Sequence, residues 1–402
     1  MPELPEVENF RRLLLPLVSR EHPLVLERCS LEKIPPRKFI TDREISDIVK
    51  SKFFVADVLR KGKLLCMVLK LENEMKERGG VKNDTTKFLF LHMGMTGRIS
   101  TPDFIPKLKV LSKAESYPPS YTYLQMIAGS NQACFSDPRK FGAIYVKDFL
   151  EEDFDILAPD AWISTCQISK QNENLHDGGA QGSCSESTIA DIVAKLSQQS
   201  MGIKGVLLDQ KRALCGIGNW VADEVLYQTK MHPDQNYLTH EEAKNLLRSL
   251  NFILKKAIRC LDKKEDYPRD WLFHYRWKKR SGSKSIVKDF HGRSIAFVVS
   301  GGRTSAVVTS IQKKKSRKLV AATARKEQIK QGNTNKRIAS SKVATRPEVA
   351  VSERNKKLKV TTKAQKKKIE DSKNKLKNPK EDTGVFAGIK RQTRRSPRLV
   401  KT

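Results

Sequence analysis

The hydrophobic residues of the N-terminal part of the chain change from a helical to a strand-like spacing. After Pro2 and Pro5, apolar residues at helical intervals predict a short amphipathic helix: Val7, Phe10, Leu14, Leu17 and Val18. Apolar runs separated by polar or glycine-containing turns then predict short strands: 53–59, 64–71, 88–91, 121–127 and 143–146. A solvated loop is expected over 72–87. Residues 1–162 therefore read as a mostly antiparallel sheet domain with a helix at its start.

The pattern becomes helical again after a polar stretch. Residues 163–187 are rich in Ser, Gln, Asn and Gly, which predicts a flexible linker. Two capping signals follow, Thr188 with Asp191 and Thr239 with Glu242, and a long apolar face over 243–261 continues the second. The run Gly216-Ile217-Gly218-Asn219 interrupts the pattern before another helix over 220–229. Residues 188–280 are therefore expected to form a helical domain.

The last third of the chain contains a small hairpin and a tail. Strand-like runs on either side of Gly301-Gly302 predict a hairpin within 281–310, so the fold class is α+β. Residues 311–402 contain no Cys, Trp or Tyr and a single Phe, with 30 basic and 7 acidic residues. Such a segment buries too little apolar surface to offset the entropy of ordering it, so we expect a disordered tail.

Charge and cysteine content narrow the class of protein. The net charge of the chain is +32, which makes a polyanionic partner the first hypothesis, although the first 310 residues carry an excess of only 9. No run of 18 or more apolar residues and no signal pattern is present, so neither a membrane span nor secretion is expected. The seven scattered cysteines form no C-x-x-C pair, which indicates reduced thiols and no zinc site. No cofactor fingerprint occurs either, and no cofactor is expected.

The first residues of the chain offer a nucleophile. If Met1 is removed, Pro2 exposes a secondary amine, and an α-amino group titrates near about 8 whereas lysine titrates near about 10.4. Attack of such an amine on a sugar C1′ gives an iminium, and Glu3 is close enough in sequence to act as the acid. The alternative is that Pro2 and Pro5 only mark the start of a helix.

The sequence MPELPEVE resembles the N-terminal signature of formamidopyrimidine-DNA glycosylases, the Fpg branch of the Fpg/Nei base-excision repair family. Further ordered motifs continue this resemblance: Arg60-Lys61-Gly62-Lys63-Leu64, His92-Met93-Gly94-Met95-Thr96-Gly97, Asp137-Pro138-Arg139-Lys140-Phe141-Gly142, Asp209-Gln210-Lys211 with 216–224, and Gly301-Gly302-Arg303-Thr304. The resemblance implies a β-sandwich-like domain with an N-terminal helix, a helix-two-turns-helix DNA-binding domain over 188–280 and a zincless finger over 281–310, as in plant and fungal members.

The resemblance also assigns roles in catalysis. Pro2 would attack C1′, Glu3 would act as the acid and Glu6 would order the site. Lys63 would hold a phosphate beside the flipped nucleotide and assist elimination, and Arg303 would bind a phosphate and support the second elimination. The alternatives are a solvated surface lysine at Lys63 and an ordinary turn before Arg303.

A damaged base inside a duplex must be flipped out and the hole filled. Met95, Arg139 and Phe141 suit that task as a flexible plug, a donor to the orphaned base and an aromatic wedge. The family usually has a second arginine at the position of Lys140. A lysine there would hold a phosphate only as a point charge. Three further DNA contacts are expected at Lys211, Asn219 and Tyr121. The alternatives are core positions for Met95 and Phe141 and a simple helix cap at Asn219.

Other departures from the family pattern limit the resemblance. Tyr121 and Tyr123 stand where bacterial members carry histidines, and no cysteine follows Cys260, so the four-cysteine zinc finger is absent. The stretch 262–276 is shorter than the bacterial region that caps an oxidised purine, so selectivity for 8-oxoguanine is expected to be weaker.

These features indicate a bifunctional DNA glycosylase and abasic-site lyase that removes oxidised purines through a Pro2 Schiff base and cuts the strand by β,δ-elimination, without metal or cofactor. Its expected partner is damaged double-stranded DNA, bound by a monomer, and the lysine-rich tail indicates a nuclear protein. The alternatives are a non-catalytic basic DNA- or chromatin-binding protein and a Nei-like glycosylase for oxidised pyrimidines.

Overall fold

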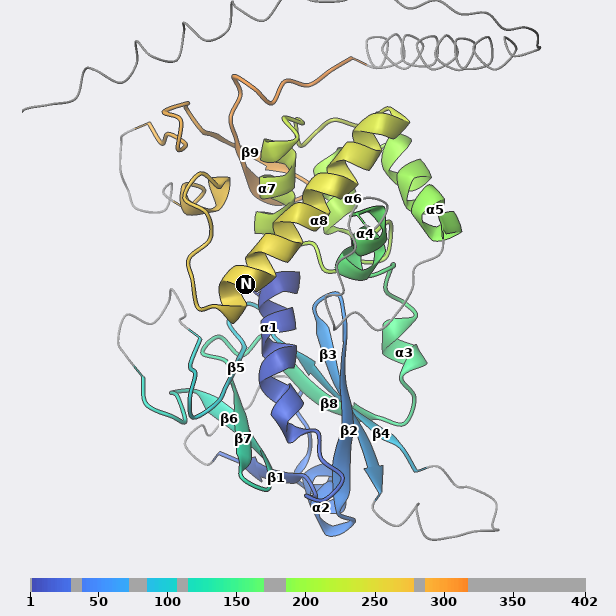
Figure 1. Ribbon diagram of the computed structural model, residues 1–402, viewed down its shortest axis with the longest axis vertical. Coiled ribbons are helices and arrows are strands. Elements are labelled where there is room, and N and C mark those ends of the chain that lie inside the picture. The colour runs from blue at the N-terminus through green and yellow to red at the C-terminus, as the bar shows by residue number, and fades with distance from the viewer. Residues whose placement is uncertain are drawn as a thin grey trace, which may run out of the picture. The chain divides into compact units, whose positions relative to one another are not determined.

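The computed structural model describes residues 2–29, 38–71, 85–106, 115–169, 186–277 and 286–316. Three expected features lie partly outside these ranges: most of the polar loop over 72–87, most of the linker and nearly all of the tail. Figure 1 shows the order of the described elements, with the N-terminal helix beside the sheets and the remaining long helices grouped together.

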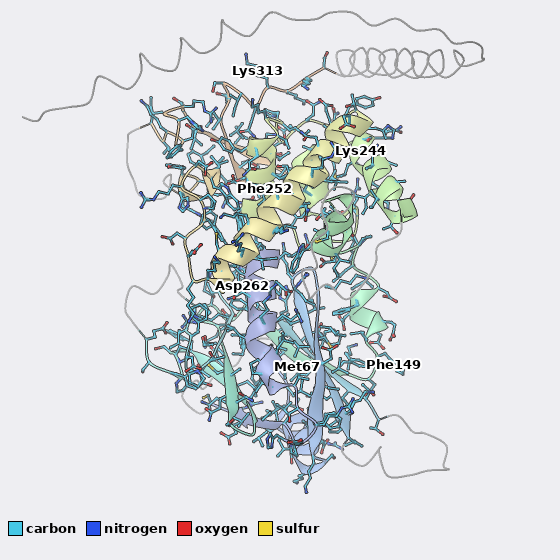
Figure 2. The ribbon with its side chains drawn as sticks, in the orientation of Figure 1. Met67, Phe149, Lys244, Phe252, Asp262 and Lys313 are labelled. Carbon is cyan, nitrogen blue, oxygen red and sulfur yellow. The ribbon has the colours of Figure 1, made fainter. Side chains whose placement is uncertain are left out.

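The predicted N-terminal helix is α1 (Leu4–Leu14), and a short 3₁₀ turn over Leu15–Leu17 follows it. Glu3 occupies the N-cap, and Glu6 completes a capping box by accepting a hydrogen bond from the Glu3 backbone N–H at 2.9 Å. The helix ends before Val18, whose backbone is extended. Arg12 near its end pairs with Asp262 on the last turn of another helix, α8 (His240–Asp262). Figure 2 labels Asp262 at the end of α8 that lies next to α1.

Two antiparallel four-stranded sheets form the N-terminal domain. One has the order β2 (Phe53–Lys61), β3 (Leu64–Leu71), β4 (Lys87–His92), β8 (Ala143–Lys147). The other has the order β1 (Val25–Arg28), β6 (Thr122–Ala128), β7 (Asn131–Ser136), β5 (Arg98–Ser100). Residues of both sheets and the apolar face of α1 share one core that includes Phe10, Leu65, Leu89 and Phe135. The five predicted strands are confirmed, and the sandwich-like packing agrees with the expected α+β fold.

Several elements of this domain were not predicted. They are the strands β1, β5 and β7 and the helices α2 (Asp42–Lys50) and α3 (Glu151–Phe154). β5 has only three residues, and its first, Arg98, is buried with its charge paired to Glu115 at 2.5 Å. Such a short strand with a charged inward residue has no recognisable apolar period.

The second domain is helical. Its elements are α4 (Ala161–Ser169), α5 (Glu186–Ser197), α6 (Ile203–Leu208), α7 (Asn219–Gln228), α8 and a 3₁₀ turn over Leu272–His274. The capping box of Thr239 and Glu242 at the start of α8 is confirmed. α4 occupies the segment where the flexible linker was expected to begin at residue 163, because Asp160 caps it and Ser164 and Thr165 are buried.

The hairpin consists of β9 (Ala296–Ser300) and β10 (Arg303–Val307), joined by Gly301 and Gly302, both with positive φ. The chain stays packed beyond residue 310, where the tail was expected to begin. The Gln312 side chain is buried and donates to the Met231 carbonyl at 2.9 Å, and Lys315 pairs with Glu242 at 2.5 Å. The packed part therefore continues to Lys315.

No helix among the described residues is long and apolar enough to cross a membrane. The same ranges contain no group of three or more His, Cys, Asp or Glu side chains placed to hold a metal ion.

Candidate active site

The N-terminus is anchored in the helical domain. The Leu4 backbone N–H donates to the Gly216 carbonyl at 3.1 Å, and the Leu4 side chain is fully buried in the core of the helices. Gly216 has a φ of +99°, and a Cβ placed on it would lie 2.4 Å from Leu4 Cδ1. Pro2 is buried beside these contacts. The residue predicted to be the nucleophile is therefore held between the two domains.

Glu3 binds the N-terminus of α7. Its Oε1 accepts from the Trp220 N–H at 2.8 Å, and its Oε2 accepts from the Val221 N–H at 3.0 Å. A helix N-terminus stabilises a negative charge through such unpaired N–H groups and through the helix dipole. Gly218 makes this contact possible, because a Cβ there would lie 2.2 Å from the Glu3 carboxyl carbon.

Glu6 lies next to Glu3 and accepts hydrogen bonds from two aromatic side chains. Its Oε1 accepts from the Tyr267 hydroxyl at 2.9 Å, and its Oε2 accepts from Trp220 Nε1 at 3.4 Å. The Trp220 and Tyr267 rings are stacked, with centroids 5.3 Å apart. Burial, together with the Glu3 charge, raises the pKa of Glu6 to about 7. This carboxyl can therefore exchange a proton near neutral pH.

Lys63 is the cation of this site. It lies in the β2–β3 turn, and its Nζ donates to the Ile217 carbonyl at 2.8 Å, in the loop that also carries Gly216 and Gly218. Burial lowers the pKa of Lys63, and the Glu3 charge opposes that shift. Burial likewise raises the pKa of Glu3, opposed first by Lys63. The two groups are thus electrostatically coupled.

A buried carboxylate fixes the turn that carries Lys63. Asp160 Oδ2 accepts from the Gly62 N–H at 2.7 Å and from Arg60 Nη1 at 2.5 Å. Arg60 in turn pairs with Glu8 of α1 at 2.9 Å. Gly62 has a φ of +60°, and a Cβ on it would lie 2.9 Å from Cys215 Sγ. Three segments far apart in sequence therefore hold this turn in place.

Two loops of the sheet domain form a second part of the site. Asp137 is fully buried and accepts from the Thr96 hydroxyl at 2.5 Å and from the Gly142 N–H at 2.7 Å. A Cβ on Gly94 would lie 2.3 Å from the Phe141 carbonyl carbon. The loop with Met95 and the tip with Phe141 are therefore in direct backbone contact.

The side chains predicted to enter DNA lie on these loops. Phe141 is 55% exposed, and the Arg139 guanidinium lies 5.0 Å from the centre of its ring. Met95 is half-buried, whereas its neighbour Met93 is a core residue. Phe141 is thus not a core residue, and the alternative considered for it is wrong. Lys140 between Arg139 and Phe141 has a φ of +59°, which marks a tight turn.

The remaining predicted residues lie at three places. Arg303 is exposed at the start of β10, and its charge lowers the pKa of Lys63. Asn219 begins α7, and its side-chain amide donates to the Thr304 carbonyl at 3.1 Å. Tyr121 is exposed, and its carbonyl accepts from the Asp137 N–H at 3.0 Å, beside the Phe141 tip. Lys211 is an exposed turn residue, and its backbone N–H donates to Asp209 Oδ1 at 3.0 Å.

Two clusters result from this arrangement. Pro2, Glu3, Glu6, Lys63, Asn219 and Arg303 gather around the start of α7, and Met95, Arg139, Lys140, Phe141 and Tyr121 gather around Asp137. The first lies where the N-terminus, marked N in Figure 1, meets the helices.

Sequence reasoning missed the residues that support these clusters: Asp160, Asp223, Tyr267 and Arg276. Asp160 directly precedes a helix and had a detectable signal, since Asp is a favoured N-cap. The other three gave no local signal, because their partners are 19 to 261 positions away.

Comparison with known proteins supplies independent information. Residues 1–144 match the family model described as the formamidopyrimidine-DNA glycosylase N-terminal domain, and residues 179–265 match that of its H2TH domain. A protein of Arabidopsis thaliana named formamidopyrimidine-DNA glycosylase is 28% identical over 327 residues, covering 78% of this chain and 71% of its own length. One of the same name from Rickettsia africae is 26% identical over 263 residues, covering 64% and 78%.

Solved structures are similar as well. A crystal structure of formamidopyrimidine-DNA glycosylase from Lactococcus lactis, bound non-covalently to DNA with an abasic site, has a TM-score of 0.51 and 20% identity. One from Thermus thermophilus has a TM-score of 0.50 and 22% identity. Both alignments cover 78% of this chain and all of the other. At this identity they show a shared fold.

Proposed function

The chain belongs to the formamidopyrimidine-DNA glycosylase family, and on that premise we propose that it is a bifunctional DNA glycosylase and abasic-site lyase that removes oxidised purines from double-stranded DNA. One observation carries the proposal: the buried Pro2-Glu3 terminus is held on the N-terminus of α7, with Glu6 and Lys63 beside it. A protein that only binds DNA has no need for such a terminus.

The chemistry begins at the Pro2 nitrogen once Met1 has been removed. That nitrogen bonds to C1′ as the bond from C1′ to the base breaks; the Glu3 carboxylate takes up the amine proton, and the departing base takes up a proton from water. The sugar ring then opens as O4′ receives a proton from Glu3, which leaves a C1′=N⁺ iminium. Loss of a C2′ proton expels the 3′ phosphate, and loss of the C4′ proton expels the 5′ phosphate. Water finally hydrolyses the iminium and restores the amine.

The surrounding groups prepare this reaction. The α7 N–H groups fix the Glu3 carboxyl, and Glu6, whose pKa is near neutral, exchanges protons close to the amine. Lys63, with its lowered pKa, holds a phosphate next to the reacting sugar or accepts a C2′ proton. Asn219 and Arg303 contribute donors for the flanking phosphates.

The second cluster handles the DNA itself. We propose that Met95, Arg139 and Phe141 fill the space left by the flipped nucleotide, because an exposed aromatic ring stacked with a guanidinium suits insertion between base pairs. Lys140 and Tyr121 contact the backbone at the same tip, and Lys211 contacts it from the helical domain. The enzyme acts as a monomer on damaged duplex.

A panel of duplexes tests the function. Base release and strand cleavage are measured on DNA with a formamidopyrimidine, 8-oxoguanine, a hydantoin, an oxidised pyrimidine or no lesion. We expect release from the purine lesions, weakest for 8-oxoguanine, and both β- and δ-elimination products. Glu3→Gln should abolish release, whereas Glu241→Gln, at an exposed ion pair on α8, should not change it.

Two outcomes of this assay would contradict the proposal and identify a different function. Equal binding to all duplexes without base release would identify a non-catalytic DNA- or chromatin-binding protein. Preferential release of the oxidised pyrimidine would identify a Nei-like glycosylase.

We also propose that the lysine-rich tail directs the protein to the nucleus. The support is its charge, since basic runs serve as import signals. A fluorescent fusion that ends at Ser316 retains the packed segment around Gln312 and should lose nuclear accumulation. Unchanged accumulation would refute the proposal.

A further inference from the structure

Three charged side chains are buried together against the β9–β10 hairpin. Asp223 of α7, Lys204 of α6 and Arg276 have side chains that are 1%, 0% and 4% exposed. Asp223 Oδ1 accepts from Lys204 Nζ at 2.5 Å, and its Oδ2 accepts from Arg276 Nη2 at 2.7 Å. Buried charges are costly unless they are paired and hydrogen-bonded, so this group calls for a physical reason.

This buried network binds the hairpin directly. Asp223 Oδ2 also accepts from the Ala306 N–H at 3.2 Å, and Lys204 Nζ donates to the Ser305 hydroxyl at 2.6 Å. Both contacts fall on β10 within three residues of Arg303. The turn is close to α6 as well, since a Cβ on Gly301 would lie 2.8 Å from the Gly205 Cα.

The same network is coupled to the catalytic acid. With two cations and one carboxylate it carries a net positive charge, and Glu3 supplies a compensating negative one. Burial raises the pKa of Glu3, and the Arg276 charge opposes that rise; burial lowers the pKa of Lys204, and the Asp223 and Glu3 charges oppose that fall. Arg276 also donates to the Asn219 carbonyl at 3.3 Å, at the start of α7 where Glu3 is bound.

We propose that Asp223 is a positioning residue of the reaction: through Lys204 and Arg276 it fixes β10 and so places Arg303 for the second elimination. This inference rests on the proposed function. A two-stranded hairpin is marginal by itself, and the described residues around it contain no metal-binding group that would hold it. The buried network provides that support from inside the protein.

The experiment uses the full-length chain on a duplex with a preformed abasic site. The measured quantity is the ratio of β,δ- to β-elimination products in a single turnover at saturating enzyme. Asp223→Asn should lower that ratio about tenfold, because it weakens a charged contact and leaves two cations poorly paired. Ser305→Ala, which removes only the Lys204 contact, should lower it about threefold.

Ser300→Ala is the matched control. Ser300 lies on β9 of the same hairpin and donates to Asp234 Oδ1 at 2.6 Å, a hydrogen bond of equal length outside the network. This variant should keep the ratio of the unmodified protein. Thermal melting establishes that each variant is folded, and if Asp223→Asn does not fold, the comparison of Ser305→Ala with Ser300→Ala decides.

A double-mutant cycle separates positioning from general destabilisation. In an Arg303→Ala background, Asp223→Asn and Ser305→Ala should cause no further change in the ratio, because their effect acts through Arg303. The inference is overturned if folded variants keep the ratio, if Ser300→Ala changes it as much as Ser305→Ala, or if the effects persist without Arg303. If the unmodified protein does not cleave the abasic duplex, the proposed function itself fails.

Discussion

At the scale of single residues, the contact between Glu3 and α7 depends on the absence of a side chain at Gly218. Its backbone has a φ of −118°, which any residue can adopt, so its restriction comes from space alone. The Glu3 carboxyl occupies the position that a Cβ would take. The glycine is therefore needed for the approach of Glu3 to α7.

Gly218→Ala should displace Glu3 and slow base release by a factor of about 100 or more, as expected when a group in a reacting site moves by about 1 Å. Single-turnover base release measures the effect. Gly292→Ala is the control, because it adds a methyl group at a turn with nothing within 4 Å, although its φ of +76° makes it strained. Equal losses in the two variants would assign the effect to stability.

The Glu224 carboxyl offers a test of the electrostatics at a residue outside the proposed chemistry. Burial raises its pKa from the ordinary 4.5 to about 7, although it accepts a hydrogen bond from the Phe273 N–H at 3.0 Å. The pKa of Glu224 is higher in the folded protein than in the unfolded chain. The contribution of Glu224 to stability is therefore complete below pH 4.5 and is lost as the pH rises to about 7.

Glu224→Gln lacks this titration. The stability of the unmodified protein relative to the variant should therefore fall by up to about 3 kcal/mol between pH 4.5 and 7 and then remain level. Urea unfolding at pH 5, 6, 7 and 8 gives the difference. A difference that does not vary with pH would contradict a raised pKa.

At this scale the sequence allowed prediction of the residues near the chain start and in glycine-containing loops. Their chemistry or their turns mark them locally. It could not reveal Tyr267 as the partner of Glu6, because the two are 261 positions apart. A buried tyrosine looks the same in sequence whether it packs in a core or donates to a carboxyl.

Among the elements, those with a long apolar period were predictable and the short polar ones were not. α8 has 23 residues with a cap and a continuous buried face, so pattern and structure agree. β7 begins with two exposed polar residues, and α4 has no clear amphipathic face, since its residues 161–166 are all buried or half-buried. Tertiary contacts define such elements.

Asp160 joins the β2–β3 turn to the start of α4 and, through Arg60, to α1. Its loss should therefore affect more than one element. Asp160→Asn should lower the free energy of unfolding by about 3 kcal/mol, since it leaves the buried Arg60 guanidinium short of a partner. Glu241→Gln removes an exposed ion pair and should cost less than about 1 kcal/mol. Urea unfolding compares the two, and similar small losses would rule out the proposed role of Asp160.

At the scale of the whole molecule, the residues expected to give general affinity for DNA are separate from those of the proposed reaction. Residues 317–402 carry 27 basic and 7 acidic residues, whereas the proposed reaction uses residues of the packed part. Cations that neutralise phosphates make binding depend steeply on salt, with a slope of about 0.9 per phosphate contact.

A chain that ends at Ser316 should therefore bind undamaged duplex more weakly at moderate salt and show a shallower salt dependence. Its single-turnover cleavage at saturating enzyme should equal that of the full chain, because the residues of the site are retained. Fluorescence anisotropy over a salt series and a cleavage assay measure the two properties. An unchanged salt slope would mean that the tail does not contact DNA.

The central claim is that the amine of Pro2 forms the covalent intermediate. Borohydride reduction with a duplex that contains an oxidised guanine, followed by peptide mapping, tests it most directly. The account predicts a trapped adduct on a mature N-terminus that begins at Pro2, and no adduct when that terminus is chemically blocked or Met1 is retained. An adduct on a lysine, or one that persists with a blocked terminus, would contradict it.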